Sequence, residues 1–201
     1  ENGLFSRHNH NDKLTLLTYL TNCLHKTNKY KKSLEIAKTL KLAMEEHDGF
    51  LFDKYIFYYY NALVLNYAKE NKEKALEVLQ LAKENKSIKK LPGYTSFIYL
   101  NTGLIYYYKE NYNLAKRNIS RLIQQEDFLS LDVAFQFKLL IVDLIIRLKI
   151  GQDDIIQEKL KELKLNYKKN LNDKKYQRDA LVVETITKHI NNIDIDKKLI
   201  S

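Results

Sequence analysis

Residues 57–71 read FYYYNALVLNYAKEN, and residues 97–111 read FIYLNTGLIYYYKEN. The two stretches lie about 40 positions apart and align without a gap. Identical positions include Phe57 and Phe97, Asn61 and Asn101, Tyr67 and Tyr107, and Asn71 and Asn111. Self-similarity at a fixed period is typical of repeat architectures. The first residues of each unit therefore predict one apolar, aromatic helix, and the shared Lys-Glu-Asn predicts a turn after it.

A second helix is predicted after each turn. Apolar or small residues recur there at helical spacing, at Ala75, Leu79 and Ala82 in one unit, and the other unit keeps the same stripe. The matching residues are Ala115, Ile119 and Leu122. Small side chains at Ala75 and Ala115 would let the second helix pack closely on the first.

The same frame extends along the chain in weaker form. We expect four two-helix repeats at about 12–46, 52–86, 94–126 and 131–167, and a capping helix at 173–199. Gly151 is expected to end a helix and Asp153 to cap the next one, with loops at 87–94 and 167–173. Neighbouring repeats would bury a continuous core. The prediction is an all-α chain, a single domain over residues 1–201 of a larger protein, stacked as a right-handed α-α superhelix.

The third repeat resembles the tetratricopeptide repeat family. It carries Gly103, Tyr106, Tyr112 and Ala115 where that family places small and aromatic residues. The longer period resembles the long-repeat sensor domains of bacterial regulators. The resemblance implies a concave groove, lined by the first helix of each repeat, that binds a protein or peptide segment.

The resemblance also implies which residues line that wall. Asn61 and Asn101 are the leading candidates, since an amide can both donate to and accept from a peptide backbone. The alternative is that both bond between helices and that the tyrosines are core. The remaining predicted groove residues are Asn22, Tyr60, Tyr67, Tyr107 and Tyr108, and Val64 and Phe97 are also expected on the wall.

The expected partner is an apolar or neutral peptide. The family's carboxylate-clamp variant needs three cations that are missing here, where Thr18 and Phe97 take two of their positions. The formal net charge is +9, but most of the excess is lysine and the expected wall holds little charge, so nucleic acid is disfavoured as a partner. A signal-sensing domain of a larger bacterial regulator remains the alternative function.

Several other classes are disfavoured. No nucleotide-binding, zinc-protease or hydrolase motif occurs, so we expect no enzyme, no cofactor and no metal. His8-Asn9-His10 is expected to be an exposed start or the remnant of an upstream helix, and the single cysteine, Cys23, to be buried and inert. No apolar run is long enough to span a membrane, and a cytoplasmic location is expected.

Overall fold

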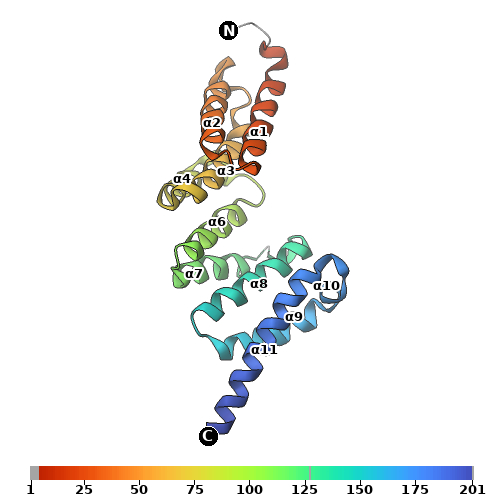
Figure 1. Ribbon diagram of the computed structural model, residues 1–201. Coiled ribbons are helices and arrows are strands. Elements are labelled where there is room, and N and C mark those ends of the chain that lie inside the picture. The colour runs from red at the N-terminus through yellow and green to blue at the C-terminus, as the bar shows by residue number, and fades with distance from the viewer. Residues whose placement is uncertain (1–4, 127, 201) are drawn as a thin grey trace. The chain divides into compact units, whose positions relative to one another are not determined.

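A computed structural model describes residues 5–126 and 128–200 of the chain (Figure 1). Within these residues the regular structure is entirely helical, as the sequence predicts. The α-helices are α1 (His10–Lys26), α2 (Tyr30–Glu45), α3 (Phe52–Glu70), α4 (Lys72–Glu84), α5 (Lys86–Lys89), α6 (Tyr94–Tyr108), α7 (Tyr112–Ile123), α8 (Val133–Lys149), α9 (Asp153–Asn166), α10 (Lys168–Asn172) and α11 (Gln177–Ile200). The short 3-10 turn η1 (Arg7–Asn9) precedes α1, and η2 (His47–Gly49), η3 (Phe128–Ser130) and η4 (Lys174–Tyr176) lie between helices.

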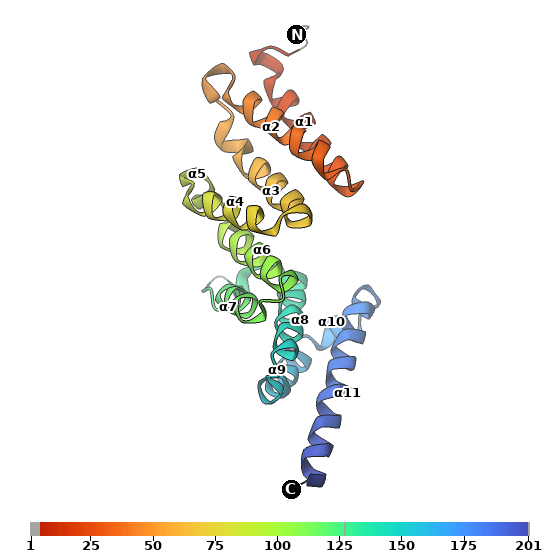
Figure 2. The ribbon, with the colours of Figure 1, turned by 60° about the vertical axis from the view of Figure 1, so that its left-hand side comes forward.

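The chain divides after Ile105, in the last turn of α6, into two compact units. In the first unit α1 and α2 lie side by side as an antiparallel pair, and α3 packs against both (Figures 1 and 2). Fully buried side chains fill the space where α1, α2, α3 and α5 meet, and burying each contributes about 1.5–3 kcal/mol. They include Leu14, Leu40, Met44, Ile56 and Ile88.

The second unit is built on the pair α8 and α9, with α11 packed against both. Its core includes Phe137, Ile156, Leu160, Val183 and Ile186. Two further aromatic rings, from Tyr167 and Tyr176, pack on Phe137 with centroid separations of 5.5 and 5.6 Å. This aromatic cluster fixes the end of α9 against α8.

The predicted repeat has a physical basis in the turns. The side chain of Asn71 accepts a hydrogen bond from the backbone nitrogen of Lys74 at 3.0 Å, and Asn111 accepts one from Leu114 at 3.2 Å. Both asparagines therefore begin the second helix of their pair as N-caps. The small residue that follows is fully buried in each case, at Ala75 and Ala115, and Ser33 is its buried counterpart in α2.

Some sequence-based expectations need correction. Gly151 does end α8, with a left-handed φ of +67° that suits glycine, but Gln152 and not Asp153 occupies the N-cap of α9. The expected loops at 87–94 and 167–173 contain the short helices α5 and α10. Ile88 of α5 is fully buried, so this segment folds back as part of the core.

A buried polar network joins the first three helices. The side chain of Asn66, in α3, is fully buried and donates from Nδ2 to Ser33 Oγ at 2.9 Å and to the Ala62 carbonyl at 2.7 Å. Ser33 donates in turn to the Thr21 carbonyl at 2.8 Å, and Asn66 Oδ1 lies 3.2 Å from His25 Nδ1. Because buried polar groups are costly unless satisfied, this network fixes how the helices pair.

No helix among the described residues is both long and apolar enough to cross a membrane.

Candidate functional site

The predicted wall residues of the first unit are half-buried. The side chain of Asn61 makes no hydrogen bond within the described part of the chain, whereas Asn101 Nδ2 donates to the Phe97 carbonyl of its own helix at 2.7 Å. Tyr60 and Tyr67 pack against the apolar core with part of each ring, and the ammonium group of Lys74 lies 5.2 Å from the Tyr67 ring. Asn22 is also half-buried.

Two predicted wall residues belong to the second unit. The rings of Tyr107 and Tyr108 meet edge to face at 5.7 Å, and Tyr107 also lies 5.5 Å from Tyr112. Tyr108 is 65% exposed, so its ring is available to solvent. Asn61, Asn101 and these tyrosines therefore remain predicted groove residues.

Two other positions expected on the wall are core residues. Val64 is 1% exposed and Phe97 is 8% exposed. Phe97 stacks edge to face on Phe57 at 5.0 Å. The physical reason is that α3 and α6 bury side chains on more than one face, so helical spacing alone does not tell a groove residue from a core residue.

The second unit contains a pocket of about 640 Å³ between α7, the η3 turn, α8 and α9. A volume of this size lies within the range of small-ligand and peptide side-chain sites. Two side chains at its edge are strongly exposed for their type, Leu129 at 81% and Val133 at 54%. The other apolar lining residues are Ile123, Phe128, Leu140, Leu144, Leu163 and Tyr167.

The charged residues of the pocket are mostly acidic. Glu126, Asp143 and Glu162 face a single lysine, Lys159. Arg147 does not line the pocket but pairs with Asp143. With this arginine counted, three carboxylates stand against two cations, so the charged residues of the pocket carry a net charge of −1. The whole chain carries +9, so the pocket is an acidic patch on a basic protein.

Asp143 is the deeply buried charge of this site, at 1% exposure. Its Oδ2 atom accepts from Arg147 Nε at 2.8 Å and lies 3.4 Å from Lys159 Nζ. Its Oδ1 atom is buried without a hydrogen-bond partner. Burying a carboxylate is costly unless cations pair with it, and here the cations come from the same helix and from α9.

Hydrogen bonds of one glutamine tie the η3 turn, α8 and the end of α9 together at the pocket. Gln136 is 5% exposed, and its Nε2 atom donates to the carbonyls of Leu129 and Leu131 at 3.1 and 2.8 Å. The Tyr167 hydroxyl donates to Gln136 Oε1 at 2.8 Å. Burial raises the pKa of Tyr167 above its ordinary value of 10.0, so this donor stays protonated at neutral pH.

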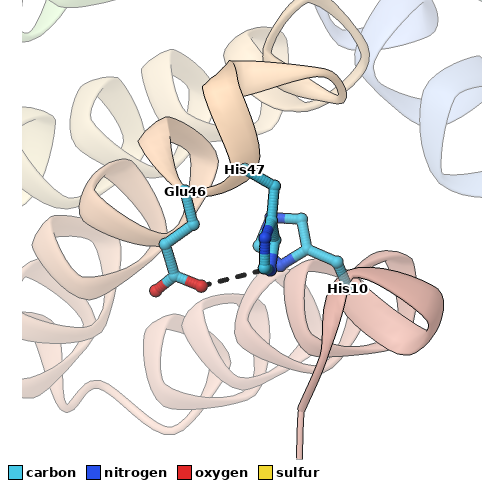
Figure 3. Close-up of side chains that lie close together, drawn as sticks. All are labelled: His10, Glu46 and His47. Carbon is cyan, nitrogen blue, oxygen red and sulfur yellow. Dashed lines mark ion pairs between the residues drawn. The ribbon is translucent and has the colours of Figure 1, made fainter.

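A cluster of possible metal ligands lies in the first unit. His10 begins α1, and Glu46 and His47 follow the end of α2, so the packing of these helices brings them together (Figure 3). Their ligand atoms all lie within 4.8 Å of one another. The expectation of an exposed start at His8-Asn9-His10 is therefore wrong for His10, which is 1% exposed, although His8 is exposed.

Cys23 is exposed, not buried as expected from the sequence. In α1 the buried positions include Leu14, Thr18 and Thr21, and Cys23 lies on the side of the helix that faces solvent. Two of the buried positions are polar threonines, which can be buried because their hydroxyls donate to backbone carbonyls of the same helix, and this pattern gave no sign that Cys23 lies outside the buried face.

Neither site was predicted from the sequence, although one of them has a recognisable pattern there. Asp143 and Arg147 are a charged pair four residues apart inside the apolar run FKLLIVDLIIRLK. Such a pair in a buried helix indicates a polar site. The His10 cluster left no comparable signal, since its residues come together only through the pairing of α1 and α2.

Comparison with protein-family models, with curated proteins and with solved structures finds no match to this chain. The resemblance to tetratricopeptide repeats consequently rests on the residues of the sequence.

Proposed function

We propose that this chain is a non-enzymatic helical-repeat module that binds a protein or peptide segment in the pocket of its second unit. The observation that carries the proposal is the pocket itself, which is large and mainly apolar and has Leu129 and Val133 exposed at its edge. Exposed apolar side chains beside a preformed pocket are typical of interaction sites.

The charge of the pocket selects the class of peptide. Glu126 and Glu162 are exposed carboxylates next to apolar lining residues. A segment that inserts a Leu, Phe or Met side chain and places a Lys or Arg beside it would satisfy both features. Acidic segments would be repelled, so binding should discriminate by charge as well as by apolar contact. This refines the apolar or neutral peptide expected from the sequence.

The repeat architecture is part of the same proposal. The shared asparagine caps at Asn71 and Asn111 and the buried small residues after them support a tetratricopeptide-like unit. A right-handed superhelix built from these pairs would offer a second surface at the predicted groove residues. The experiment below tests that surface by replacing Asn61 and Asn101.

The test is a binding titration by fluorescence anisotropy with the full chain. Two sets of labelled twelve-residue peptides are used, one combining Leu or Phe with Lys or Arg, and one in which Asp or Glu replaces the basic residues. Binding is measured for the wild type, for Leu129→Asp, for a matched control Leu165→Asp, and for the Asn61→Ala/Asn101→Ala double variant. Leu165 is 79% exposed, nearly the same as Leu129 at 81%, but it does not line the pocket.

We expect basic apolar peptides to bind and acidic ones not to bind. Since burying one leucine is worth about 1.5–3 kcal/mol, Leu129→Asp should weaken binding about tenfold or more, and Leu165→Asp should leave it unchanged. Equal loss in both leucine variants would refute the pocket as the site. Loss only in the double asparagine variant would move binding to the groove predicted from the sequence.

A further inference from the structure

We infer that His10, Glu46 and His47 form a binding site for one divalent transition-metal ion, and that zinc is the ion this donor set fits best. Two imidazoles and one carboxylate are a donor set of borderline softness that suits zinc, cobalt and nickel. The site lies in the first unit and is independent of the peptide pocket.

The buried imidazole of His10 is the strongest observation. Its side chain is 1% exposed, and neither Nδ1 nor Nε2 has a hydrogen bond of acceptable geometry. A buried polar group without a hydrogen bond costs about 1–3 kcal/mol, and the carboxylate of Glu46 lies 3.7 Å from His10 Nδ1, too far for one. A bound metal ion would give His10 a partner, because it takes up a ring nitrogen directly.

The backbone carbonyl of Ala43 lies near the His10 ring. A ligating histidine usually donates its other ring N–H to such a carbonyl, so this neighbour suits His10 as a ligand.

The spacing of the donors is close to what a metal requires. His10 Nδ1 lies 3.7 Å from Glu46 Oε2, and the His10 and His47 rings meet edge to face with centroids 4.8 Å apart. Zinc bonds of about 2.0–2.1 Å place tetrahedral ligand atoms about 3.3 Å from one another. The ligand atoms, which lie within 4.8 Å of one another, would have to close by up to about 1.5 Å to reach this spacing, and rotation of the half-buried His47 side chain can supply part of that change. Figure 3 shows the three side chains pointing toward a common space.

Lys13 keeps Glu46 in place. Its ammonium group lies 2.7 Å from Glu46 Oε1 and 2.8 Å from Oε2. Monodentate coordination through Oε2 would leave Oε1 paired with Lys13, so ion pair and metal bond can coexist. The lysine charge opposes a cation, and the affinity expected is therefore moderate.

The backbone of the turn that carries His47 is strained, and this conformation places the His47 ring near His10. His47 and Asp48 are consecutive non-glycine residues with left-handed φ angles of +53° and +60°. This backbone region costs an ordinary residue about 1–2 kcal/mol, and such strain tends to persist at functional sites. Here it turns the His47 ring back toward α1.

Three protein ligands leave a coordination position for water or a ligand. Glu46 is 42% exposed on its side chain, so solvent reaches one side of the cluster. Open three-ligand sites exchange ligands, whereas closed four-ligand sites are structural. We therefore expect a site that binds and releases zinc or holds it together with an external donor.

The test is calorimetric titration of the chelator-treated full chain with zinc chloride. The variants are His47→Ala and Glu46→Gln, with His8→Ala as the matched control, because His8 is an exposed histidine two residues from His10 and lies outside the cluster. Circular dichroism checks that each variant folds. Imidazole proton shifts on zinc addition identify the ligating histidines in the wild type.

One zinc ion per chain is expected. Losing even a supporting partner of a ligand costs about 10- to 100-fold in affinity, so His47→Ala and Glu46→Gln should each weaken binding at least tenfold, and His8→Ala should not. Only the shifts of His10 and His47 should respond. Absence of binding at about 100 µM zinc, or wild-type affinity in folded His47→Ala and Glu46→Gln, would overturn the proposal. Neither result bears on the peptide pocket.

Discussion

Replacing Asn66 with alanine should destabilise the first unit much more than the same change at Asn101. Asn66 is fully buried in α3 and links α1 and α2 through Ser33 and His25. Alanine at this position removes both Nδ2 donations and the acceptor that faces His25. Asn101 is the control, since its one described bond is to the Phe97 carbonyl of its own helix and its side chain is half-buried.

The magnitude follows from the bonds that are lost. Each buried hydrogen bond contributes about 0.5–1.5 kcal/mol net, and an acceptor left buried without its donor adds a further penalty. The Ser33 hydroxyl keeps its donation to the Thr21 carbonyl but loses the donor that it accepts from. Together with the small cavity, Asn66→Ala should cost about 2–4 kcal/mol. Asn101→Ala should cost about 0.5 kcal/mol or less.

The measurement is urea unfolding of the wild type and both variants, followed by circular dichroism and by tyrosine fluorescence. The free energy of unfolding should fall strongly in Asn66→Ala with little change in Asn101→Ala. If the two variants lose the same stability, the network does not hold α1, α2 and α3 together, and the reasoning from burial is wrong.

Three further predictions concern the second unit. Asp143→Asn should lower the free energy of unfolding by about 3 kcal/mol, because it leaves Arg147 and Lys159 without their anion; a loss below about 0.5 kcal/mol in urea unfolding would contradict this. Gly151→Ala should lower the free energy of unfolding by about 1 kcal/mol because of the φ of +67°, and not because of a clash, since nothing lies near an added Cβ. Gly151→Asn should cost less in the same measurement. A larger cost for asparagine than for alanine would count against this explanation. Burial raises the pKa of Tyr167, so the stability that its hydroxyl contributes is present in full below pH 10.0 and is lost as the pH rises from there toward the folded-state pKa. The difference in the free energy of unfolding between the wild type and Tyr167→Phe should therefore narrow above pH 10.0. A constant difference would refute this assignment.

The all-α class and the positions of the main helices were within reach of the sequence. Local signals suffice for that purpose: the stripe at Ala75, Leu79 and Ala82 predicts an amphipathic helix, and Asn71 predicts its cap. The helix ends were less predictable, because Gln152 makes a cap with its backbone alone and Asp153 is a better capping residue by type.

The sites were beyond such local reasoning. His10 and Glu46 are 36 positions apart and meet only because α1 and α2 pair, and Leu129 lies at the pocket in a turn whose carbonyls accept from Gln136, seven positions along the chain. Asn66 illustrates the same limit within one helix. The repeat alignment singles out Asn61, because it matches Asn101. The buried and hydrogen-bonded asparagine is Asn66, five positions later in α3.

The most direct test of the proposed function is methyl NMR of the full chain with the tightest-binding basic apolar peptide. The proposal predicts the largest shift changes at Leu129, Val133 and Leu140, with little change at Leu165. Shift changes confined to methyl groups near Asn61 and Asn101, or the absence of any change under saturating peptide, would contradict binding in the pocket of the second unit.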